Sequence, residues 1–375
     1  MKRRRFLQAG SMVAISAIVP ALGCDRNEVQ VTAMPTAPDM DLPLDTPAAQ
    51  LPLPPITPND RFYLQSINGK DYDPRVNSGG WQLAVDGLVD RPLKGLTYAE
   101  IIAMPLQRQT LTLQCIGNWI GGPLVGNAEW GGTPFANLLD QAGVKAEALQ
   151  VKFYSIDGYT TSIPLERARR AEVLLVWEMN GEVLPSKHGY PVRLINPGHY
   201  GQKMPKWITR IELIDDEYKG YWESKPENKP YKWSDEAQAT VNSRIDAPLS
   251  LWDDVQDPAN GGVAKTYQTL RGKTGDAFVI HGVAMAGEQP VARVEVSADG
   301  GVTWEEAHIT TQSLPNIWVT WGYEWHLPAT GRYELIARAT DSEGSTQPQE
   351  DKGVDLYDGR TGWHHVPVDV VRVEG

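Results

Sequence analysis

Short runs of alternating apolar and polar residues recur through the first half of the chain, and each run predicts a β-strand. These strands are expected at residues 81–87, 109–114, 151–156, 173–179, 192–195 and 207–214. Three helical patterns lie between them, at residues 98–104, 134–142 and 164–171. Thr97 and Glu100 form a capping box before the first helix, while Thr133 and Gly143 are expected to cap the second. This mixture predicts an α+β domain with mixed sheets.

After about residue 242 the pattern becomes entirely β-like. Strands are expected at residues 278–285, 291–297, 302–309 and 331–341, and the Asp-Gly-Gly sequence at 299–301 predicts a hairpin turn. A further strand-like segment carries three tryptophans, Trp318, Trp321 and Trp325, which we assign to a core and an interface rather than to chemistry. The spacing of these strands is typical of an immunoglobulin-like sandwich.

Two segments precede the predicted domains. Residues 1–24 contain consecutive arginines, Arg3 to Arg5, before an apolar region, which is typical of a twin-arginine export signal. Residues 25–58 contain eight prolines and no apolar periodicity, which predicts an unfolded tether. We therefore expect a periplasmic protein with a first domain at 59–241 and a second at 242–375.

The two cysteines of the chain have different expected fates. Cys24 ends the sequence ALGC, which resembles a lipoprotein cleavage box, so two outcomes stay open: a lipid anchor at Cys24, or an ordinary signal cleaved nearby. In either case Cys115 is the single thiol of the mature chain, which excludes an internal disulfide. A Cys-x-x-Cys-His haem site and a cysteine-ligated iron–sulfur cluster are excluded for the same reason.

The net charge narrows the class of partner. It is −12 for the whole sequence, and removal of the four leader cations, Lys2 and Arg3 to Arg5, takes it to −16. An acidic surface argues against nucleic-acid binding and is compatible with a basic protein partner, such as a cytochrome.

Cys115 lies at the end of a predicted strand, before a stretch rich in glycine and asparagine. This stretch contains Gly117, Asn118, Gly121, Gly122, Gly126 and Asn127, and is expected to form a loop. One alternative is a buried free cysteine. A core cysteine does not need such a loop, so we favour a thiolate ligand to a soft metal, or a nucleophile.

A second group of polar residues lies on or beside loops in the same domain. His188, Arg193, Lys203 and Lys206 occur among glycines and prolines. Clustered cations beside exposed backbone amides suit a phosphate-bearing ligand, while the alternative is a solvated basic loop.

Several long segments occur in the order found in one known family. They read LQCIGN, GNAEWGGTPFANLLDQAGV, DGYTTSIPLERA, LLVWEMNGEVLPSKHGYPVRL, PGHYGQKMPKW, VEVSADGGVTWEEA and ARATDSEGSTQP. Across residues 59–350 the chain thus resembles the sulfite oxidase family of molybdopterin enzymes. The resemblance implies a molybdopterin domain with mixed sheets, followed by an all-β immunoglobulin-like domain that forms a homodimer.

The resemblance also implies a cofactor, Mo-molybdopterin, and residues that bind it. Cys115 occupies the place of the thiolate that ligates molybdenum. The implied cofactor contacts are Tyr63, Leu64, Ser155, His188, Arg193, Met204, Pro205 and Lys206. Tyr231 matches a family tyrosine near the metal and is a candidate catalytic residue, with an ordinary packed tyrosine as the alternative.

Some positions depart from the family pattern, and all concern substrate cations. Gln65 and Ile67 stand where sulfite oxidases have Arg and His, Ile317 lies at the place of an arginine beside Trp318, and Trp119 replaces another arginine. A pocket with fewer cations favours a less charged substrate than sulfite.

The function that follows is oxidation of a small molecule by two-electron oxygen-atom transfer, as in a sulfite dehydrogenase. Because the chain carries no haem segment, electrons are expected to pass to a separate carrier such as a c-type cytochrome. Two alternatives stay open: an S- or N-oxide reductase with the same cofactor, and a non-catalytic binding protein on this scaffold.

Overall fold

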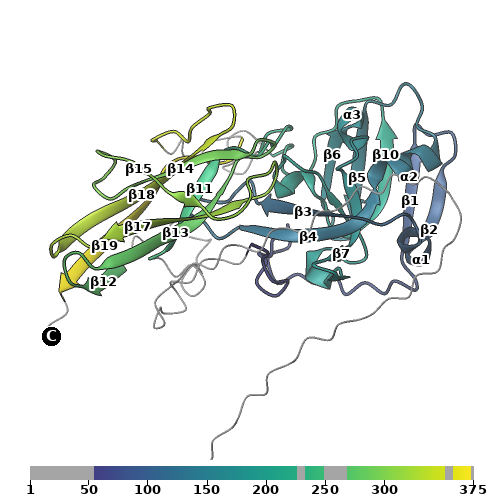
Figure 1. The fold of residues 1–375 in the computed structure, drawn as a ribbon. Helices are drawn as coiled ribbons and strands as arrows, with labels where there is room; N and C mark the ends of the chain where they lie inside the picture. The colour runs from purple at the N-terminus through teal and green to yellow at the C-terminus, as the bar shows by residue number, and fades with distance from the viewer. Residues whose placement is uncertain (1–54, 226–232, 249–267, 351–357, 373–375) are drawn as a thin grey trace, which may run out of the picture. The chain divides into compact units, whose positions relative to one another are not determined.

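The computed structural model describes residues 55–225, 233–248, 268–350 and 358–372. These residues form four β-sheets with few and short helices (Figure 1). None of the described helices is long and apolar enough to cross a membrane.

Two sheets belong to the first part of the chain. One has the order β2-β1-β10-β5-β6, with strands Leu93–Thr97, Gln82–Gly87, Ile208–Ile214, Gln150–Ser155 and Thr160–Pro164. The other has the order β3-β4-β7-β8, with strands Gln107–Gln114, Val125–Pro134, Leu174–Met179 and Glu182–Val183, and β9 (Arg193–Ile195) also pairs with β7. Because β1 and β10 are parallel while the other pairs are antiparallel, the predicted mixed-sheet domain is confirmed.

The helices are short: α1 (Tyr98–Ile102), α2 (Phe135–Ala142) and α3 (Leu165–Ala168). In α2, Phe135, Leu138, Leu139 and Ala142 are buried, which is the i, i+3, i+4, i+7 spacing of one helix face. Gly143 ends this helix with a φ of 68°, as predicted, since a left-handed residue closes the last turn. The capping box of Thr97 and Glu100 is also confirmed.

The predicted N-cap of α2 is wrong. Strand β4 runs directly into the helix, so Thr133 stays in the sheet opposite Leu175 and Pro134 takes the cap position without a side-chain hydrogen bond. The Thr133 hydroxyl instead accepts a hydrogen bond from Asn137 Nδ2 at 3.0 Å.

The glycine-rich loop is shorter than predicted. Residues 125–127 already belong to β4, so only the segment from Cys115 to Leu124 forms the loop, which we call the cysteine loop. Gly126 lies in a strand because the Phe62 ring packs on it, and a Cβ there would come within 2.7 Å of that ring. Glycine thus serves close packing here as well as chain reversal.

The second part of the chain is a two-sheet sandwich. One sheet has the order β11-β13-β17-β16, with strands Asn242–Ala247, Ala277–Met285, Val319–His326 and His308–Ile309. The other has the order β12-β19-β18-β14-β15, with strands Gln268–Gly272, His364–Arg372, Gly331–Asp341, Val291–Ser297 and Glu305–Glu306. Both sheets contribute residues to one core, among them Ile280, Trp321, Val294 and Leu335, so the predicted all-β sandwich is confirmed.

The long strand predicted at residues 302–309 is wrong. Only the two-residue strands β15 and β16 form there. The Asp299 carboxylate accepts hydrogen bonds from the amides of Val302 and Thr303, at 3.1 and 2.9 Å. An aspartate side chain therefore takes the place of a strand partner at this turn.

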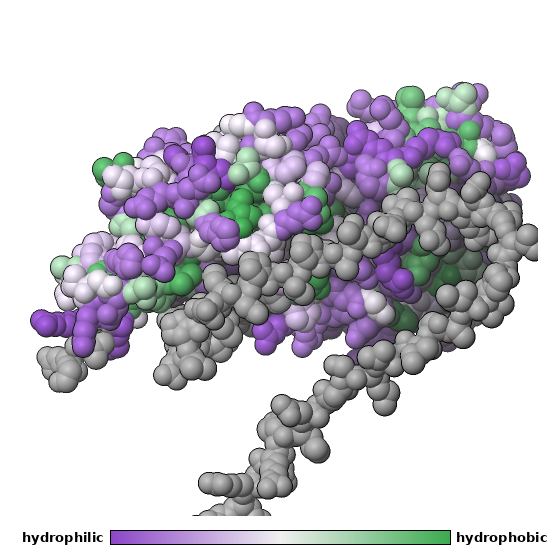
Figure 2. Space-filling view, viewed as in Figure 1, coloured by the Kyte–Doolittle hydropathy of each residue, from purple (hydrophilic) through white to green (hydrophobic). Residues whose placement is uncertain are grey.

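The three tryptophans do not supply an exposed apolar face. Trp318, Trp321 and Trp325 are 4%, 1% and 6% exposed within one chain. Trp321 and Trp325 lie in the sandwich core, while Trp318 packs with Val125 of β4. One face of the molecule is correspondingly polar, with apolar residues in small separate groups (Figure 2).

Candidate active site

Cys115 directly follows β3 and opens the cysteine loop. Its amide donates to Leu124 O at 2.9 Å, and its carbonyl accepts from the Asn118 amide at 3.0 Å. The buried Asn118 side chain accepts from the Leu124 amide at 2.9 Å and donates to Gly122 O at 3.4 Å. An asparagine is needed here because its amide satisfies a donor and an acceptor across the loop.

The Cys115 thiol is free and partly buried. Burial raises its pKa to about 11, although a hydrogen bond from the Gly117 amide acts in the opposite direction. Without a cation the group is therefore a neutral thiol at pH 7, and a bound metal ion would favour the thiolate. Among the described residues no group of three His, Cys, Asp or Glu side chains comes together, so Cys115 is the single protein ligand that this site offers.

Three phenols surround the thiol. Burial raises the pKa values of Tyr63, Tyr159 and Tyr200, and negative charge on Cys115 raises each of them further. Tyr159 donates to Gln202 O at 2.6 Å, and the Tyr200 hydroxyl lies 3.0 Å from Thr240 Oγ1. These side chains are therefore protonated donors at neutral pH.

A cluster of buried cations lies on the far side of Tyr63. It consists of His188, Arg193 and Lys206, and the first two are each 5% exposed. Arg193 opens strand β9, donates to His188 O at 3.0 Å and stacks over Trp130 at 4.9 Å. Lys206 donates to Lys187 O at 3.0 Å. Backbone carbonyls thus hold these cations in place.

The charge of this cluster is not balanced by an ion pair. Within the described part of the chain, no carboxylate lies within ion-pair distance of Arg193 or Lys206. Burial, with Arg193 adding to it, lowers the pKa of Lys206 to about 7, and Asp157 opposes this shift. Burial likewise lowers the pKa of His188 to about 4. Buried cations of one sign are costly alone, so the cluster suits an anionic ligand.

Unused polar atoms point to the same ligand. Arg193 Nε and Ser155 Oγ are buried without a hydrogen-bond partner, and such atoms in native proteins call for an explanation. Gly189, with a φ of 123°, lets Arg193 and Lys206 approach, since a Cβ there would lie 3.0 and 3.2 Å from their Cβ atoms. The donors, the charge and the close backbone together fit a phosphate-bearing cofactor.

Tyr63 connects the cluster to the cysteine. Its pKa responds to both Cys115 and Arg193, and Phe62 stacks on it at 5.4 Å while contacting His188 edge-on. The next residue, Leu64, is partly buried.

The remaining predicted residues fall into two groups. Met204 O accepts from Arg193 Nη2 at 3.4 Å and Pro205 O accepts from the Leu194 amide at 3.0 Å, so both lie against the cation cluster. Tyr231 lies outside the described residues. The structure therefore brings together Cys115, Tyr63, His188, Arg193, Met204, Pro205 and Lys206, with Ser155 supplying one of the unused polar atoms.

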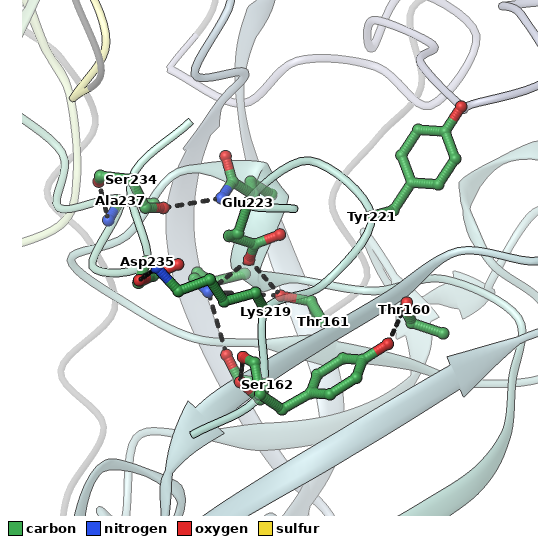
Figure 3. A network of polar contacts seen from close by, with 12 residues as sticks. Thr160, Thr161, Ser162, Lys219, Tyr221, Glu223, Ser234, Asp235 and Ala237 are labelled. Atoms are coloured by element: carbon green, nitrogen blue, oxygen red, sulfur yellow. Dashed lines mark hydrogen bonds and ion pairs between the residues drawn. The ribbon is translucent and has the colours of Figure 1, made fainter. Parts of the chain in front are cut away.

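One buried ion pair was missed from the sequence. Lys203 Nζ lies 2.6 Å from Glu223 Oε1, and the two side chains are 3% and 1% exposed. The Glu223 carboxylate also accepts from Thr161 Oγ1 at 2.9 Å (Figure 3). Only the three-dimensional fold brings these residues together, so local pattern gives no signal for the pair.

This ion pair fixes the chain beside the cysteine loop. The short helix η3 (Gly201–Lys203) holds Glu223 through Lys203, and it holds the Ser234 carbonyl through Gln202 Nε2 at 2.9 Å. The neighbouring Trp233 ring packs on Gly117, at 3.5 Å from a Cβ placed there. Both flanks of residues 226–232 are therefore anchored close to Cys115.

The comparisons with known proteins agree with this geometry. The family model described as "Oxidoreductase molybdopterin binding domain" matches residues 71–222, and "Mo-co oxidoreductase dimerisation domain" matches residues 263–371. Sulfite oxidase of Arabidopsis thaliana is 27% identical over 362 residues, covering 83% of this chain and 87% of that protein. Sulfite oxidase of Gallus gallus is 30% identical, covering 82% of this chain and 72% of that protein.

Other matches differ in length or cover both chains nearly in full. The chain spans 55–62% of the length of the mitochondrial sulfite oxidases that it matches. Among solved structures, sulfane dehydrogenase SoxCD of Paracoccus pantotrophus superposes with a TM-score of 0.67 and 25% identity, covering 83% of this chain and 80% of that one. Fold, cysteine loop and cation cluster agree with these matches: the chain belongs to the sulfite oxidase family of oxidoreductases, and its cofactor is Mo-molybdopterin.

Proposed function

We propose that this protein oxidises a small sulfur compound by two-electron oxygen-atom transfer, in the manner of a sulfite dehydrogenase. The observation that carries the proposal is the pairing of one free thiol in a tight loop with a buried cation cluster that lacks a counter-charge. The relatives named sulfite oxidase and sulfane dehydrogenase support sulfur as the reacting element.

Cys115 would hold the metal as a thiolate. The bound cofactor supplies the two-electron redox chemistry and the oxygen transfer. The amide of Gly117 already donates to the sulfur, and such a hydrogen bond withdraws charge from a metal-bound thiolate and tunes its potential.

The cation cluster would hold the phosphate end of the pterin. Arg193 and Lys206 provide positive charge, while Arg193 Nε and Ser155 Oγ provide unused hydrogen-bonding capacity. An arginine beside a phosphate forms charge-assisted hydrogen bonds, which are roughly twice as strong as neutral ones.

The phenols near Cys115 would orient the substrate and exclude water. Since burial keeps Tyr63, Tyr159 and Tyr200 protonated, they add no negative charge beside an electron-rich sulfur substrate. Protonated phenols are hydrogen-bond donors to oxygen atoms in such a pocket.

The test measures metal and turnover together. Purified protein should contain one molybdenum and one pterin per chain, and it should oxidise sulfite with ferricyanide or cytochrome c as acceptor. A parallel assay reduces a sulfoxide and an N-oxide with a reduced viologen. Turnover only in the reductive assay would replace the proposal by an oxide reductase, and metal-free protein without turnover would leave a binding protein.

The same proposal includes a place and a partner. The arginines at residues 3–5 and the net charge of −12 support export by the twin-arginine route and electron transfer to a basic c-type cytochrome. Replacement of Arg3, Arg4 and Arg5 by Lys should retain the protein in the cytoplasm, as measured by cell fractionation, while Cys24→Ala should release it from membranes if Cys24 is lipidated. Periplasmic protein in the Lys variant would contradict the export proposal.

A further inference from the structure

We propose that Arg360, supplied by the sandwich domain, binds the negatively charged oxygen of the substrate beside the cysteine loop. Arg360 would thereby make the enzyme selective for sulfur oxyanions over neutral sulfur compounds. This inference rests on the proposed function, since it names the substrate class and a specificity residue for that site.

The first observation is a stack between the two domains. The Arg360 guanidinium carbon lies 3.7 Å from the centroid of the Trp119 ring, and Arg360 is 7% exposed. Trp119 belongs to the cysteine loop, four residues after Cys115. An arginine stacked on an aromatic face keeps its N–H groups in the plane of the guanidinium, where they are directed at the stack's edge.

The second observation places this segment against the phenols of the site. Gly359 has a φ of 85°, and a Cβ there would come within 2.7 Å of the Tyr200 ring. The pKa of Tyr200 responds to charge on Asp358 and on Cys115, after the larger effect of burial. Tyr200 therefore lies between residues 358–359 and the thiol, so Arg360 approaches the cysteine side of the loop.

The third observation is that Trp119 stands on a fixed base. The His364 ring fills the space of a Gly121 side chain, and its Nδ1 accepts from the Ile245 amide at 3.0 Å. Arg244 donates to Gly122 O at 2.9 Å, while its own charge is balanced by Asp246 at 2.6 Å. A loop held at two successive glycines keeps the tryptophan ring in one position.

These observations change the charge account of the pocket. The resemblance implies cations at the positions of Gln65, Ile317 and Trp119, and all three are uncharged in this chain. Arg360 returns one positive charge to the position of Trp119, from a different part of the chain. A partly buried oxyanion needs such a charge, because an unpaired buried anion is strongly disfavoured.

The experiment compares two arginine–tryptophan stacks in the same domain. Arg360→Gln removes the proposed contact, and Arg338→Gln removes a matched stack over Trp304, at 3.9 Å, away from the cysteine loop. In metal-loaded protein, Arg360→Gln should raise the KM for sulfite about tenfold while kcat changes little, since one charge-assisted hydrogen bond is lost. Arg360→Lys should restore part of the affinity, and Arg338→Gln should behave as wild type.

Two outcomes would overturn the proposal. One is an unchanged sulfite KM in Arg360→Gln. The other is a parallel loss of kcat and molybdenum content with every substrate, which would make Arg360 a support for the cysteine loop.

A binding measurement separates this proposal from the proposed function. Calorimetric titration of the metal-loaded protein with sulfate, a non-reacting oxyanion, should show binding in wild type and at least about tenfold weaker binding in Arg360→Gln. If no sulfur compound turns over, the proposed function fails, and the sulfate titration still decides the role of Arg360. Equal sulfate affinity in both proteins, or none in wild type, would overturn the role.

Discussion

At the scale of single residues, the site depends on groups held in protonation states that they would not have in water. Cys115 is a neutral thiol with a pKa of about 11, and Lys206 is a buried amine with a pKa of about 7. Burial is the main cause for both, because it disfavours the charged form of each group. Each group can therefore gain its charge when an opposite charge binds, which couples cofactor binding to proton movement.

Replacement of Cys115 tests the metal ligand directly. Cys115→Ser changes one sulfur to oxygen in a loop whose shape is set by Asn118 and backbone hydrogen bonds, so the fold should persist. Activity should fall at least about a hundredfold, since a hydroxyl is a poor donor to a soft metal. Thermal unfolding followed by circular dichroism, with metal analysis of the same sample, checks both statements, and full turnover in the variant would contradict the assignment.

Replacement of Lys206 tests the cation cluster through pH. The folded-state pKa of about 7 is below the ordinary value of 10.5, so the unfolded chain binds more protons between these values. Stability of the cofactor-free protein should therefore rise as pH increases from about 7 to about 10 through this group.

The matched variant isolates that contribution. Lys206→Met should reduce the rise in unfolding free energy over this range, measured by urea unfolding at several pH values. Identical pH profiles for wild type and variant would show that Lys206 is not buried as an unbalanced cation.

At the scale of elements, local pattern predicted what local interactions decide. The apolar spacing of α2 and the alternation in β5 and β13 were sufficient because each face packs on one core. The cap at Thr133 and the extent of the cysteine loop were wrong because strand pairing with β7 and the ring of Phe62 overrode the local preference. The pair of Lys203 and Glu223 and the stack of Arg360 on Trp119 join distant segments, which no periodicity reveals.

The buried ion pair beside the site is predicted to be costly to break. Glu223→Gln leaves the Lys203 charge without its partner at 2.6 Å, in a place where both side chains are almost inaccessible. Removing one partner of such a pair costs about 3–5 kcal/mol. Urea unfolding should show this loss, and the double variant Lys203→Met with Glu223→Leu should recover part of it, whereas a double variant as unstable as the single one would contradict the charge argument.

At the scale of the whole molecule, the sandwich domain matches a dimerisation family, and we propose a two-fold homodimer. The interface must use residues other than Trp318, Trp321 and Trp325, because these are already buried within one chain. Light scattering at micromolar concentration should therefore give twice the chain mass of 41.5 kDa. A monomer mass at that concentration would contradict the proposal.

The hold of the sandwich domain on the cysteine loop has a consequence for how such proteins diversify. Trp318 packs on Val125, Arg244 holds Gly122, and Arg360 stacks on Trp119. The module that carries the cofactor therefore does not by itself determine what the enzyme acts on. A chimera that keeps residues 59–241 and takes its sandwich domain from a relative should inherit the relative's substrate preference, so the two halves are expected to evolve as one unit of selection.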